Sequence, residues 1–134
     1  MTPDISELHN AIKHGDVIAV RRFLDGGGLV GARDVHGRSP LSMAATEGDT
    51  AIIRELLDRG ADVNERWPGY DTPLVLAAMS GSLPAVELLL ARGAKTDADG
   101  VPVPELLNRL GYGHEGKIII AIELARLSSG LTSA

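Results

Sequence analysis

The feature that most constrains this chain is an internal repeat of 33 residues. When the sequence is shifted by 33 positions, the same residue types recur in five columns, with three members in each. These columns are Leu8, Leu41 and Leu74; Ala11, Ala44 and Ala77; Gly15, Gly48 and Gly81; Leu24, Leu57 and Leu90; and Gly27, Gly60 and Gly93. Chance does not produce five such columns at one spacing. The chain is therefore expected to stack several copies of one structural unit.

Residues 39–60 show the pattern of one unit. Ser39 followed by Pro40 is typical of a helix start, because serine caps the first turn and proline fits inside it. Gly48 is expected to end this short helix, and Asp49 to cap a second one. The second helix carries an apolar stripe, formed by Ile52, Ile53, Leu56 and Leu57. Each unit is thus predicted to be a pair of helices, followed by a segment that turns back as a hairpin.

A resemblance to the ankyrin-repeat family rests on two strings, SPLSMAATEGDTAIIRELLDRGADVN at 39–64 and TPLVLAAMSGSLPAVELLLARGA at 72–94. The 33-residue period and the TPLHxA-type helix start are the signature of that family. The histidine of this motif is missing from both strings, where Ser42 and Val75 stand instead; only His9 occupies its column. The resemblance implies that this histidine ties neighbouring repeats together, so weaker contacts between repeats are expected.

The resemblance implies one domain over residues 1–134, an all-α solenoid of about four helix-turn-helix repeats joined by β-hairpin-like loops. The expected parts are an N-terminal capping repeat at 1–33, repeats at 34–66 and 67–99, and a degenerate C-terminal capping repeat at 100–130. Terminal repeats diverge because one of their faces meets water. The last repeat is expected to hold helices near 105–110 and 115–127. Asp4 and Glu7 stand at capping-box spacing before the first helix.

Composition narrows the class of function. The chain has 134 residues, 44% of them hydrophobic and 23% charged, as in one soluble globular domain. A net charge of −5 with scattered Lys and Arg argues against binding to nucleic acid. No cysteine is present, which excludes disulfides and thiolate chemistry. Arg outnumbers Lys ten to three, which suits a GC-rich bacterial genome. Neither a membrane-length apolar run nor a signal-peptide pattern is found, so a cytoplasmic location is expected.

The sequence supports no catalytic site, metal site or cofactor. His9 and His14 are five residues apart, not the four that place two ligands on one helix face. Acidic residues at helix junctions are typical of N-terminal capping; they are Asp16, Asp49 and Glu47. The glycine run after Asp25 lacks the ending of a phosphate-binding loop. The protein is therefore predicted not to be an enzyme.

The resemblance implies that a partner protein docks on the concave side of the stack, through positions that vary between repeats. The positions carried over residue by residue include Arg38, Glu47, Arg66, Asp71, Met79 and Tyr112, and the candidate partner-binding residues are these six together with Trp67 and Tyr70. Trp67 and Tyr70 belong to no helical stripe and lie on a predicted finger, where large rings are typical of a binding site. The alternative is that Trp67 folds onto the next repeat.

Two roles are compatible with such a surface. The first is a general protein–protein interaction module. The second is a dedicated inhibitor or immunity protein that neutralises one toxin or enzyme, for which the net charge of −5 would suit a basic target. A weak homodimer is a further expectation, because the last helix carries more apolar residues than a terminal helix needs. These residues are Ile118, Ile120, Leu124 and Leu127.

Overall fold

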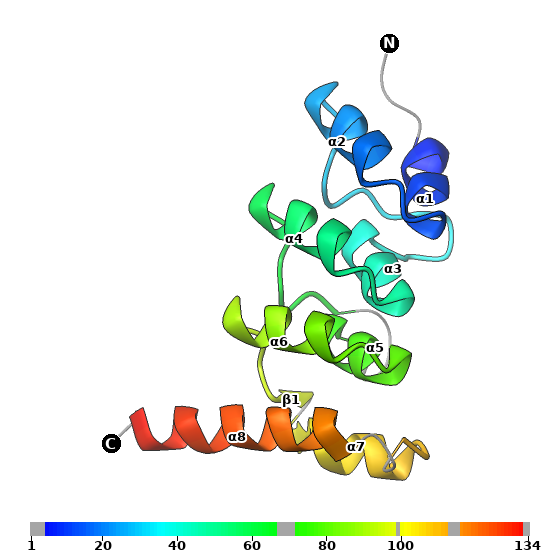
Figure 1. Ribbon diagram of the computed structural model, residues 1–134. Helices are drawn as coiled ribbons and strands as arrows, with labels where there is room; N and C mark the ends of the chain where they lie inside the picture. Colours follow the sequence, from blue (N-terminus) through cyan, green and yellow to red (C-terminus); the bar gives the residue numbers. More distant parts are fainter. Residues whose placement is uncertain (1–4, 67–71, 99, 113–115, 133–134) are drawn as a thin grey trace.

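The computed structural model describes residues 5–66, 72–98, 100–112 and 116–132. Within these ranges the chain forms eight helices, packed in four pairs that stack one on the next (Figure 1). The pairs are α1 (Ile5–Lys13) with α2 (Val17–Asp25), α3 (Pro40–Glu47) with α4 (Thr50–Asp58), α5 (Pro73–Ser80) with α6 (Leu83–Ala91), and α7 (Val103–Arg109) with α8 (Gly116–Thr132). The predicted all-α repeat architecture is confirmed.

The predicted signals for helix starts and ends act as the sequence indicates. Ser39 and Thr72 cap α3 and α5, since each hydroxyl accepts the backbone N–H three residues further on, at 3.0 and 3.3 Å. Both helices end at a glycine in the left-handed region, Gly48 with φ +68° and Gly81 with φ +80°. A residue with a side chain is strained there, so glycine is required to let the chain turn into the next helix.

Side chains of the repeat columns form a continuous core. The first leucine column, Leu8, Leu41 and Leu74, is at most 1% exposed. The alanines three residues later are also buried, and their small side chains let α1, α3 and α5 pack closely in one row. A second row is formed by α2, α4 and α6 (Figure 1). Phe23 lies in this core as well, at the position that Leu56 and Leu89 occupy in the next two units.

The segments between pairs project as fingers. Between α2 and α3, the N–H of Asp34 donates to the carbonyl of Arg38 at 3.0 Å and closes a tight turn. Between α6 and α7, β1 (Asp97–Ala98) pairs antiparallel with β2 (Val101–Pro102). The finger between α4 and α5 is described as far as residue 66. The connections are therefore hairpin-like wherever the structure describes both arms.

The last pair differs from expectation in its bounds. α7 begins at Val103, two residues earlier than predicted, and α8 runs to Thr132 instead of ending near Leu127. Ile118 and Ile122 bury one face of α8 against the stack. Beyond them, Arg126 pairs with Glu123 at 2.9 Å on the helix surface, which favours continuation of the helix.

Candidate functional site

Five of the eight predicted binding residues lie in the described part of the chain: Arg38, Glu47, Arg66, Met79 and Tyr112. The other three, Trp67, Tyr70 and Asp71, lie outside the described residues, so the structure does not place the aromatic finger. The proposed capping box also falls outside, because Asp4 is not described. The site is therefore built from the first helices and the described parts of the fingers.

A hollow of about 200 Å³ lies on the surface of α3 and brings two predicted residues together. Its lining residues are Arg38, Ser42, Met43, Thr46 and Glu47. The hollow thus combines a guanidinium, a carboxylate and an apolar thioether within one small area. This mixture can recognise a partner side chain through both charge and apolar contact.

Glu47 does not have the capping role that the sequence indicated. It is the last residue of α3 and is followed by the C-cap Gly48, so its carboxylate lies at the negative end of the helix dipole. Its carboxylate makes no hydrogen bond or ion pair with any other described residue. The sequence alone did not show which of the two helices Glu47 belongs to, because α3 ends at Glu47 and α4 begins only three residues later, at Thr50.

Met79 and Tyr112 occupy the same position as Thr46 in successive units. Both are half-buried and pack against the hydrophobic core with part of their side chains. Met79 is near the end of α5, and Tyr112 follows α7, where its N–H donates to the carbonyl of Leu107 at 2.7 Å. Each therefore offers a limited apolar surface beside the ends of the first helices.

Arg38 is held in place by Asp34, a residue that sequence reasoning missed. Asp34 accepts the backbone N–H groups of His36 and Arg38 at 2.9 Å each, and the Nε–H of Arg38 at 2.8 Å. Partial burial raises the pKa of Asp34, but these hydrogen bonds and the charge of Arg38 outweigh burial and lower it to about 2. The Arg38 side chain is 41% exposed, and its guanidinium has further N–H groups to donate.

His9 of α1 lies next to the turn formed by Asp34 and Arg38. Its Nδ1 is 3.7 Å from a carboxylate oxygen of Asp34, and its Nε2 is buried without a hydrogen-bond partner among the described residues. Burial lowers the pKa of His9, although the charge of Asp34 partly opposes this effect. His9 is therefore neutral at pH 7 and belongs to the packing between α1 and the first finger.

Ser42 takes part in a hydrogen-bonded group at the position of the missing family histidine. The hydroxyls of Ser39 and Ser42 are 2.6 Å apart, and both bond the same carboxylate oxygen of Glu65. Glu65 lies directly before Arg66 on the second finger, which is the segment between α4 and α5. This contact ties that finger to the start of α3, so the serines supply a link that the motif alone did not indicate.

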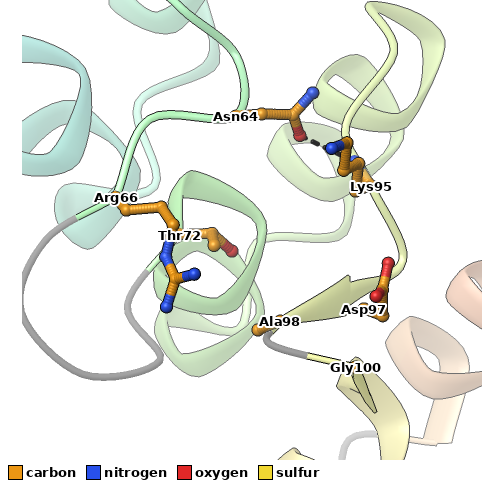
Figure 2. Close-up of a pocket in the computed structure, with 7 residues that line it drawn as sticks. All are labelled: Asn64, Arg66, Thr72, Lys95, Asp97, Ala98 and Gly100. Atoms are coloured by element: carbon orange, nitrogen blue, oxygen red, sulfur yellow. Dashed lines mark hydrogen bonds between the residues drawn. The ribbon is translucent and has the colours of Figure 1, made fainter.

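A second hollow, of about 220 Å³, lies between the second and third fingers (Figure 2). Its lining residues are Asn64, Arg66, Thr72, Lys95, Asp97, Ala98 and Gly100. Figure 2 shows the Arg66 side chain beside Thr72, while Arg33 of the first finger donates to the Arg66 carbonyl at 3.3 Å. Arg66 therefore stands at the junction of three successive fingers, next to a polar hollow.

Among the residues described, no group of three or more His, Asp or Glu side chains is arranged to hold a metal ion. None of the described helices is both long enough and apolar enough to cross a membrane.

Stacked helix pairs joined by projecting fingers define a helical repeat solenoid. A family model described as "Ankyrin repeats (3 copies)" matches residues 8–100, which is more than half of the chain. The chain belongs to the ankyrin-repeat family, whose members are generally protein–protein interaction modules and typically non-catalytic. The match begins within α1, continues through α6 and ends before α7. No curated protein matches the chain significantly.

Proposed function

We propose that this protein is a non-enzymatic binding module that recognises one partner protein through its concave face and fingers. The observation that carries the proposal is the hollow on α3, where Arg38 is fixed by Asp34 and the Glu47 carboxylate has no partner among the residues that the structure describes. A fixed guanidinium loses little entropy when it binds a partner carboxylate. A carboxylate at the negative end of a helix costs stability, so contact with a partner explains its presence.

The chemistry of the hollow indicates what the partner presents. Glu47 fits a lysine or arginine, and Arg38 fits a carboxylate or a backbone carbonyl. Met43 and Thr46, which also line the hollow, together fit a short apolar side chain of the partner. Arg66, Met79 and Tyr112 extend the surface toward the later repeats. Trp67, Tyr70 and Asp71 are assigned to the same surface from the sequence pattern.

The more specific alternative is a cytoplasmic inhibitor or immunity protein dedicated to one toxin or enzyme. The net charge of −5 favours a basic target, since complementary charge accelerates association. A dedicated inhibitor is expected to recover one stoichiometric protein from the lysate of its own source and to abolish that protein's activity. An adaptor is expected to recover several proteins, each bound weakly.

A pair of matched charge reversals tests the binding face. Glu47→Lys reverses a charge in the hollow, whereas Glu87→Lys makes the same change at an exposed position of α6, in the other helix row. With the captured partner identified by mass spectrometry, isothermal titration calorimetry is expected to show at least a tenfold loss of affinity for Glu47→Lys only. Equal affinity of both variants would place binding elsewhere. Trp67→Ala with Tyr70→Ala tests the finger in the same assay.

A further inference from the structure

The last helix keeps the register of the repeat. Ile118 and Ile122 of α8 are buried, as are Ala85 and Leu89, which stand 33 residues earlier in α6. Each position of α8 can therefore be compared with its counterparts in α2, α4 and α6. This comparison shows where the last helix departs from the others.

The departure is at positions that face outward. Ile120 and Leu124 are each 60% exposed, and Leu127 is 56% exposed. The earlier helices carry mostly charged residues in the first two of these columns: Arg21, Arg54 and Glu87 in the column of Ile120, and Asp25, Asp58 and Ala91 in the column of Leu124. Side chains that are solvated in the earlier units are replaced by large aliphatic ones in the last.

An ion-pair ladder across the second helices also ends here. Asp25 pairs with Arg59, and Asp58 pairs with Arg92, both at 2.6 Å. The next step of this ladder would join residues 91 and 125, which are both alanines. The outer surface of the stack thus changes from charged to apolar at α8.

The exposed aliphatic residues have coiled-coil spacing. Ile120, Leu124 and Leu127 are separated by four and three residues, and Lys117 precedes them by three, so together they follow a heptad seam. They lie on the face opposite the buried Ile118 and Ile122. α8 has 17 residues, against nine in each earlier second helix, and Figure 1 shows it extending past the end of α6.

We propose that this seam pairs antiparallel with the seam of a second copy of this chain. A stripe of Ile and Leu at heptad spacing is self-complementary, as a two-fold interface requires. Each copy has a net charge of −5, yet the carboxylate beside the seam, Glu123, is neutralised within its own helix by Arg126. Antiparallel pairing also places the two copies of Lys117 at opposite ends, whereas parallel pairing would bring them together.

The small area of the seam sets the strength of the dimer. Three side chains per copy bury much less than the roughly 1,200–2,000 Å² of a standard stable interface, so micromolar or weaker association is expected. Because both copies are acidic, added salt is expected to strengthen the association by screening their repulsion. The dimer would carry two concave faces and bind an oligomeric partner with avidity.

Sedimentation equilibrium with two sets of variants tests the pairing. Ile120→Glu with Leu124→Asp restores residue types that the earlier units tolerate in these columns, so the fold is expected to persist by circular dichroism. This variant should be monomeric at concentrations where the wild type dimerises. Ile18→Glu changes an isoleucine of similar exposure, 58%, on α2, and should dimerise normally. A monomeric wild type at about 1 mM, or dimerisation of the double variant, would overturn the proposal.

Cross-linking tests the orientation, since the natural chain has no cysteine. Leu124→Cys lies near the middle of the seam and is expected to form an intermolecular disulfide on mild oxidation. Lys117→Cys lies at one end and is expected to remain reduced. Efficient cross-linking through Lys117→Cys would show a parallel pair and contradict the antiparallel arrangement.

Discussion

Asn64 joins the second finger to the third by holding the main chain around Lys95. Its side-chain oxygen accepts the N–H of Lys95 at 2.8 Å (Figure 2). Its side-chain nitrogen donates to the carbonyl of Gly93 at 3.1 Å. One amide thus satisfies a backbone donor and a backbone acceptor that follow α6. The contact fixes the spacing of the fingers that border the polar hollow.

We expect Asn64→Ala to lower the free energy of unfolding by about 0.5–1.5 kcal/mol, because two solvent-exposed hydrogen bonds to the backbone are lost. Asn64→Asp should be intermediate, since a carboxylate can accept from Lys95 but cannot donate to Gly93. Urea denaturation followed by circular dichroism measures both variants. A change below about 0.5 kcal/mol for Asn64→Ala would show that water replaces the amide fully.

Gly48 is expected to tolerate alanine less well than Gly60. Both have positive φ, +68° and +98°, so both variants carry backbone strain of at least about 1–2 kcal/mol. A Cβ at Gly48 would also lie 2.9 Å from the Ser80 hydroxyl of the next pair, whereas a Cβ at Gly60 meets nothing within 4 Å. The backbone strain of alanine at φ +98° is at least as large as at +68°, so a lower unfolding midpoint for Gly48→Ala than for Gly60→Ala reports the crowding between repeats. Equal midpoints would mean that Ser80 moves aside without cost.

His9 is expected to make stability depend on pH near neutrality. Burial lowers its pKa in the folded protein below the ordinary 6.5, so the unfolded chain binds the proton more tightly. The free energy of unfolding should therefore be highest above pH 7 and fall as the pH drops through 6.5. Measured by urea denaturation at several pH values, this decline should disappear in His9→Gln. It should persist in His36→Gln, which changes an exposed histidine; loss of the decline there would contradict the assignment.

Asp34 is expected to govern a separate acid-induced loss of stability. Its pKa in the folded protein is about 2, against an ordinary 3.8, so the folded state favours the ionised form. Its contribution is complete above pH 4 and is lost as the pH falls from about 4 to 2. Asp34→Asn should be less stable than the wild type at pH 7 and should lose less stability over that range. Parallel pH profiles for the two proteins would contradict this origin.

The repeat period was sufficient to predict the stacked helix pairs and their main caps. Local rules carry this information: a serine or threonine before proline, a glycine at the helix end and an apolar stripe all act within a few residues. The buried columns follow from the same pattern, since equivalent positions of stacked units face the same core. The bounds of α7 and α8 were less well predicted, because the signals of the last unit are degenerate.

The contacts that shape the candidate site could not be predicted in this way. Asn64 reaches a residue 31 positions away, and Glu65 reaches a serine 26 positions away. Such pairs meet only after the helix pairs have stacked and the fingers have turned back. Glu47 was misassigned for a related reason, because its role depends on which of two adjacent helix ends it belongs to.

The period of the sequence shows which side chains recur at equivalent positions. Because the recurring apolar side chains can be buried only when the units stack, the period also predicts the solenoid. It does not report which face of α8 stays exposed. The exposure of Ile120, Leu124 and Leu127 was decided by the packing of α8, because α6 and α7 cover only its other face. The position of the Arg38 guanidinium, which lines the same hollow as Glu47, was likewise decided by a turn that closes in three dimensions, since hydrogen-bond geometry is a property of the folded chain.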